Sequence, residues 1–214
     1  MNVRQIILVL STFFLAFLSV NTQAAAYPPA PPGPYASSAP APQKSSSQTT
    51  PLDVLKDGIG QLQDFISSGE IYDQDKFDAF VNNQVKPFFD FDEMSRLVAG
   101  RHYQTLSPEK RQQFKARLEE MFLLAFMKQV SLHAGPQPQV DFLRPRFRGP
   151  DEVEALARVL FPNGSAKRLV FRFHKGDRGW KIYDVAANGT SAVLYYRRHF
   201  MRQVRQYGPQ GLVE

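Results

Sequence analysis

Residues 180–200, WKIYDVAANGTSAVLYYRRHF, decide the fold of this chain. The first six residues predict an aromatic β-strand, and Asn188-Gly189 predicts a turn. An amphipathic helix is expected to follow from Ser191 to Tyr207, because Gly208 ends the apolar pattern. The apolar stripe of this helix consists of Val193, Tyr196, Phe200, Val204 and Tyr207. The helix offers this stripe to a sheet and carries no obvious catalytic group, so the arrangement suits the enclosure of an apolar molecule.

Three further strands are predicted upstream, at residues 140–147, 152–161 and 167–174. In the last of these, apolar residues alternate with Arg168, Arg172 and His174, which indicates a sheet with one buried face. The connection at residues 162–165 contains Asn163-Gly164, the pair preferred at the centre of a type I′ hairpin turn. The four strands are therefore expected to form a largely antiparallel sheet.

The first half of the domain predicts helices. Apolar residues recur at helical spacing over residues 54–66, and a second helix is expected over residues 74–86, stopping before a proline. A short third helix can be capped by Asp90 or Asp92 and closed by Gly100.

The fourth helix is long. Ser107-Pro108 is a typical helix start, and the pattern continues to about His133. Residues 121–127 are apolar all round, so this part is either buried between the sheet and the other helices or lines an apolar cavity. The predicted fold class is therefore α+β: a four-stranded, mostly antiparallel sheet wrapped by helices, similar to the NTF2-like or cystatin-like arrangement.

Residues 1–26 have the layout of a secretory signal peptide. Arg4 supplies a positive start, residues 6–20 are almost entirely apolar, and Ala24-Ala25-Ala26 fits the A-x-A cleavage pattern. The apolar run is shorter than the roughly 20 residues of a transmembrane helix, which favours a cleaved signal peptide. The alternative is an uncleaved membrane anchor. We expect cleavage near Ala26.

Residues 27–51 are dense in Pro, Ala, Ser and Gln and predict a disordered linker, which leaves residues 52–214 as the folded domain. The chain has no cysteine, so it lacks both disulfides and the cysteine that a lipoprotein anchor needs. A soluble protein of a bacterial periplasm is therefore expected. The net charge of +6 is compatible with an anionic phospholipid surface and too small to indicate nucleic acid.

The sequence offers little for catalysis or cofactor binding. It contains no G-x-S-x-G, no phosphate-cradling loop and no metal-ligand spacing. The best catalytic pair is Tyr183 with Asp184, because a phenol and a carboxylate in an apolar pocket can transfer protons. Neighbouring residues of a regular strand point to opposite faces, however. Asp184 is instead expected to accept hydrogen bonds where the sheet meets the last helix, with Arg197 as a candidate donor.

Two segments carry a family resemblance. One is FDFDEMSRLVAG at residues 89–100 with SPEKRQQF at residues 107–114, and the other is the opening stretch at residues 180–200. In this order, behind a signal peptide, they resemble the MlaC family of periplasmic phospholipid-binding proteins, also known as the toluene-tolerance auxiliary family. Thr190 and Ala192 depart from the larger aliphatic residues expected there, and the proline-rich linker is unusual for the family.

The resemblance implies a carrier of diacyl phospholipid rather than an enzyme. Such a carrier shuttles lipid between an outer-membrane lipoprotein complex and an inner-membrane ABC transporter with a substrate-binding hexamer. The system maintains the lipid asymmetry of the outer membrane. The alternatives are an NTF2-like isomerase or dehydratase acting on a small apolar substrate, and an envelope adaptor with a solid core.

A carrier needs an apolar cavity, since burying acyl chains is worth about 0.8 kcal/mol per methylene. Leu169, Phe171 and Phe173 are expected to line it from the sheet, with Ala155 and Ala157 on the neighbouring strand leaving space. The helices would close the cavity with Phe122, Phe126, Val193 and Tyr196. The headgroup should stay in water at the mouth, because a buried phosphate would need dedicated partners.

Overall fold

The computed structural model describes residues 49–132 and 138–213. The predicted signal peptide, residues 27–48 of the predicted linker and the predicted helix end near His133 lie outside these ranges. The α-helices are α2 (Pro51–Ser67), α3 (Gln74–Phe80), α4 (Phe91–Ala99), α5 (Pro108–Leu132) and α6 (Ala192–Tyr207). The strands are β1 (Gln139–Phe147), β2 (Glu152–Leu160), β3 (Ala166–Gly176), β4 (Gly179–Ala187) and β5 (Thr190–Ser191). No helix in these ranges is both long and apolar enough to cross a membrane.

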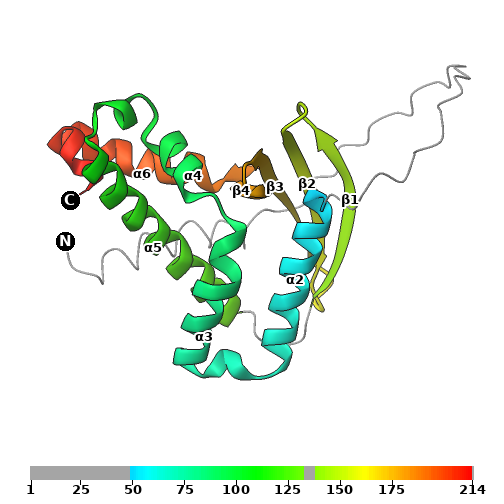
Figure 1. Cartoon of the computed structure of the whole chain (residues 1–214). Helices are drawn as coiled ribbons and strands as arrows, with labels where there is room; N and C mark the ends of the chain where they lie inside the picture. Colours follow the sequence, from blue (N-terminus) through cyan, green and yellow to red (C-terminus); the bar gives the residue numbers. More distant parts are fainter. Residues whose placement is uncertain (1–48, 133–137, 214) are drawn as a thin grey trace, which may run out of the picture.

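The strands of the described residues form one antiparallel sheet in the order β1-β2-β3-β4-β5 (Figure 1). Four strands were predicted, and the additional β5 is a two-residue strand that pairs with the end of β4. The turn between them has positive φ at both Asn188 (48°) and Gly189 (85°), as a type I′ turn requires.

The type I′ turn predicted at Asn163-Gly164 is wrong. Gly164 has a φ of 80°, but within the described residues Asn188 is the sole non-glycine residue with positive φ. The Phe161 N–H donates to the carbonyl oxygen of Ser165 at 2.9 Å, so three residues form the loop instead of two. A three-residue hairpin loop needs a left-handed residue only at its last position, which Gly164 supplies.

Two β-bulges interrupt the sheet. The β1–β2 register shifts between Leu143 and Arg146, where Pro145 cannot donate to a ladder, and β1 is an edge strand that tolerates this. In the β3–β4 pair, Arg172 lies opposite Asp184 and Phe173 lies opposite Ile182. The residue between those two partners on β4, Tyr183, is therefore the extra residue of a bulge.

The helix ends follow the predicted signals with small shifts. Thr50 and Asp53 form a capping box, so α2 begins at Pro51, one residue before the predicted start of the domain. Regular α-helix ends at Phe80 and continues as a π-helical segment, Val81–Val85, and a 3₁₀ turn, Lys86–Phe88, rather than as one helix up to the proline.

Asp90 caps α4, accepting from the Glu93 N–H at 2.9 Å, and its other oxygen lies 2.7 Å from Nε2 of His174 on β3. Burial alone would raise the pKa of Asp90, but the Glu93 N–H, His174 and Lys181 together lower it below the ordinary value of 3.8. Asp90 therefore joins the start of α4 to the sheet as a carboxylate.

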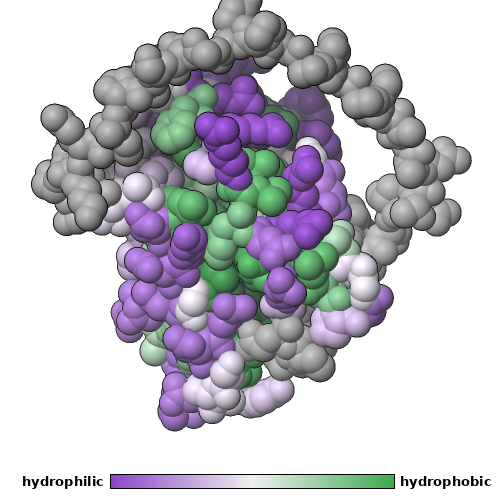
Figure 2. Space-filling view, turned by 90° about the vertical axis from the view of Figure 1, so that its right-hand side faces the viewer, coloured by the Kyte–Doolittle hydropathy of each residue, from purple (hydrophilic) through white to green (hydrophobic). Residues whose placement is uncertain are grey.

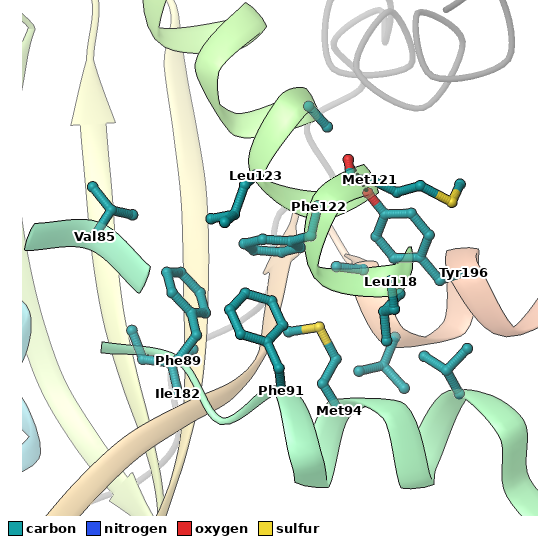
Figure 3. Close-up of a cluster of buried hydrophobic side chains, with 14 of the residues drawn as sticks. Val85, Phe89, Phe91, Met94, Leu118, Met121, Phe122, Leu123, Ile182 and Tyr196 are labelled. Carbon is teal, nitrogen blue, oxygen red and sulfur yellow. Dashed lines mark hydrogen bonds between the residues drawn. The ribbon is translucent and has the colours of Figure 1, made fainter. Parts of the chain in front are cut away.

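Figure 3 shows the part of the hydrophobic core that lies where α4, α5 and α6 meet β4. The ring of Phe122 packs edge-on against Phe89 and Phe91, with ring centroids 4.9 and 5.7 Å apart. The Asp90 N–H donates to the carbonyl oxygen of Ile182 at 2.8 Å. The two segments that carried the family resemblance are therefore bound directly to each other.

Candidate functional site

An apolar cavity of about 360 Å³ lies between the sheet and the helices. One wall is the face of α2 that carries Val54, Ile59, Leu62 and Ile66. The opposite wall is the sheet, and α5 and the segment around Phe88 close the remaining sides. Figure 2, seen from the β1 side, shows apolar side chains gathered along the middle of this face between hydrophilic ones.

Along β3, the inner-face side chains belong first to the hydrophobic core and then to the wall of the cavity. Phe173 is fully buried at the core end, whereas Phe171 and Leu169 are only half-buried although they lie in the middle of the sheet face. Large apolar side chains at such positions stay partly accessible when the space in front of them is not filled. The hollow therefore begins at Phe171 and extends toward the β2–β3 turn.

Five of the nine predicted site residues line this cavity: Phe122, Phe126, Leu169, Phe171 and Tyr196. Their contact with a ligand stays a prediction. The other four, Ala155, Ala157, Phe173 and Val193, are buried elsewhere.

Three structural causes explain why these four residues do not line the cavity. Ala155 and Ala157 lie beside Phe171 and Leu169 on the sheet, but α2 packs on β2, so the small side chains admit the helix instead of a ligand. Phe173 belongs to the core beyond the closed end of the cavity. In α6, Ala192 and Tyr196 face the cavity, and Val193 is turned about 100° away from Ala192.

A family model described as MlaC protein matches residues 57–214. The chain belongs to the MlaC family. The resemblance read from the two motifs is thereby confirmed.

A solved structure shares the fold of this MlaC-family chain. It is the phospholipid-binding protein from Ralstonia solanacearum in complex with a phospholipid, with a TM-score of 0.67 and 21% sequence identity. The match covers 75% of this chain and 90% of that one. The α+β prediction is therefore confirmed, with one more short strand than expected.

Sequence reasoning missed the contribution of α2 to the cavity of this MlaC-family chain. The apolar face of residues 54–66 predicted a helix, but its spacing does not distinguish a face in contact with core from a face in contact with a hollow. A Cβ on Gly58 would lie 3.4 Å from the ring of Phe88, an ordinary van der Waals contact, so the ring of Phe88 packs on α2 at this position. Gly58 and Phe88 both line the cavity.

Tyr183 and Asp184 lie on the same face of the sheet, contrary to the prediction, because of the bulge in β4. The ring of Tyr183 packs edge-on against His174, with centroids 5.8 Å apart, and Asp184 pairs with Arg172. His174 and Arg172 belong to the outer face, so both members of the pair point away from the cavity. Neither residue lines it.

Asp184 joins β4 to the start of α6, as predicted, but Arg197 is not its donor. Its carboxylate accepts from the Ser191 hydroxyl at 2.6 Å, from the Val193 N–H at 3.0 Å and from Arg172. Arg172 also donates to Glu154 at 3.3 Å; burial would lower its pKa, but the two carboxylates raise it. Arg197 instead lies against Gly100, where any Cβ would come within 2.6 Å of its guanidinium.

The polar groups of the cavity wall are few. The Tyr196 hydroxyl donates to the carbonyl oxygen of Met121 at 3.3 Å, and burial raises its pKa. Lys167 and several glutamines complete the polar lining. In the part of the chain that the structure describes, no group of three or more His, Asp or Glu side chains is placed to hold a metal ion.

Proposed function

We propose that this chain binds diacyl phospholipid and carries it through the periplasm. In this proposal it exchanges lipid with an outer-membrane lipoprotein complex and an inner-membrane ABC transporter bearing a substrate-binding hexamer. Its role would be to maintain the lipid asymmetry of the outer membrane. The observation that carries the proposal is the apolar cavity between α2, α5 and the sheet, in a fold shared with a relative described as phospholipid-bound.

The chemistry of the cavity favours binding over catalysis. Among the described residues, its lining includes no Asp, Glu or His, so it offers an isomerase or dehydratase no carboxylate or imidazole for proton transfer. Apolar walls favour acyl chains, at about 0.8 kcal/mol per buried methylene. We therefore favour the carrier over the enzyme.

The surface of α6 supports docking to anionic membranes. Its sequence contains four arginines, at positions 197, 198, 202 and 205, and no acidic residue. All four side chains are exposed. A cationic face of this kind attracts anionic phospholipid headgroups and raises the rate of encounter at low salt.

Native mass spectrometry of the protein purified without its signal peptide tests the proposal. The expected result is an added mass equal to one or more diacyl phospholipids, released by organic extraction. A protein that carries no lipid, and takes up none from phospholipid vesicles or detergent micelles, would refute it.

A further inference from the structure

The polar lining of the cavity consists of hydrogen-bond donors and amides. It comprises Gln61, Gln63, Gln84, Gln129 and Lys167, together with the Tyr196 hydroxyl described above. Lys167 is the one charged residue among the described lining residues. A wall of this composition can bind a ligand that carries a single negative charge.

Lys167 stands at the end of the cavity away from the core. It shares the cavity face of β3 with Leu169, Phe171 and Phe173, and six residues of strand place it about 20 Å from Phe173. Its neighbour across the sheet is Val159, which also lines the cavity. An apolar path therefore runs from Lys167 to the closed end.

The Lys167 side chain is half-buried beside an aromatic ring. Its Nζ lies 5.1 Å from the centroid of the Phe161 ring, and partial burial lowers the pKa of its ammonium. A lysine whose stem follows an apolar wall keeps its charged head where the wall meets water. A phosphate bound within reach of this ammonium would favour its charged form.

We propose that the Lys167 ammonium binds the phosphate of a phospholipid whose acyl chains extend along Leu169 and Phe171 toward the core. This inference rests on the proposed function and adds a headgroup contact to it. The bond is charge-assisted at the edge of an apolar space, which makes it stronger than one in open water. Lys167 then selects lipids that carry phosphate over neutral lipids with the same tails.

The test compares two ligands with identical oleoyl chains, phosphatidylglycerol and diacylglycerol, on the delipidated protein. The variant is Lys167→Met, which keeps the length of the side chain and removes the charge. Lys175→Met is the matched control, because Lys175 lies on the same strand with its Nζ 5.9 Å from the Trp180 ring and does not line the cavity. Lys167→Met is expected to weaken phosphatidylglycerol binding about 10- to 100-fold and to leave diacylglycerol binding unchanged.

The other variants and outcomes distinguish failure of the headgroup contact from failure of the proposed function. Lys167→Arg keeps the charge and is expected to retain phosphatidylglycerol binding, while Lys175→Met changes neither ligand. Equal phosphatidylglycerol affinity in Lys167→Met and wild type overturns the headgroup contact, as does an equal loss for both lipids. Binding of inorganic phosphate alone, lost in Lys167→Met, assigns the site to a free anion and overturns it too. A wild-type protein that binds neither lipid refutes the proposed function itself.

Discussion

Replacing Asp184 with alanine removes the acceptor that joins β4, β3 and α6. The carboxylate is 2% exposed and accepts from the Ser191 hydroxyl, the Val193 N–H and the Arg172 guanidinium. Losing one partner of a buried ion pair costs about 3–5 kcal/mol. Because Arg172 keeps Glu154 as a second carboxylate, the lower half of that range is expected. Small domains are stable by only about 5–15 kcal/mol, so the loss is large.

Urea unfolding followed by circular dichroism measures this loss, and Asp141→Ala is the matched control. Asp141 also pairs with an arginine across the sheet, Arg158, but the two side chains are 30% and 54% exposed. An exposed pair of this kind contributes at most about 1 kcal/mol. If Asp184→Ala lowers the free energy of unfolding no more than Asp141→Ala does, the bridging role is refuted. A catalytic role would instead predict full stability with lost activity in Asp184→Asn.

Three further predictions concern the cavity, the pH dependence and the basic helix. Phe171→Asp places a charge in the apolar wall, so co-purified lipid should be absent from its native mass spectrum; Phe147→Asp, at a side chain 72% exposed, should keep it. Asp90 has a folded pKa below its ordinary value of 3.8, so its contribution to stability is complete above that value and is lost as pH falls through the folded pKa. Urea unfolding from pH 6 to pH 3 should therefore show a weaker pH dependence in Asp90→Asn, and an identical slope would contradict the assignment. Arg198→Glu with Arg202→Glu should reduce sedimentation with anionic vesicles at low salt, and high salt should abolish the difference. Vesicle binding that neither the variant nor salt changes would exclude the α6 surface.

Local patterns predicted the helices and strands well because the responsible interactions are short-range. Capping by Asp90, the glycine at the end of α4 and the alternation in β3 depend on residues within a few positions of one another. The same reasoning failed at Asn163-Gly164 because turn type depends on loop length, which the pairing of Phe161 with Ser165 sets.

The cavity could be predicted only in part. Periodicity identified Phe171 and Leu169 as facing inward, but whether a helix or a hollow lies opposite is decided by packing between distant segments. Ala155 shows the limit, since its small side chain admits α2 rather than a ligand. The bulge at Tyr183 was equally hidden, because one extra residue in a strand leaves no signature in apolar spacing.

That bulge has a consequence for the shape of the binding space. A bulge bends its strand and increases the local twist, and this sheet has one in β4 and another in β1, toward its two edges. Deleting Tyr183 would leave Ile182 and Val185 on their present face and yet straighten β4. The contour of the hollow is thus governed by backbone geometry as well as by the side chains that line it. A residue on the outer face of the sheet can thus set the width of the cavity on the inner one.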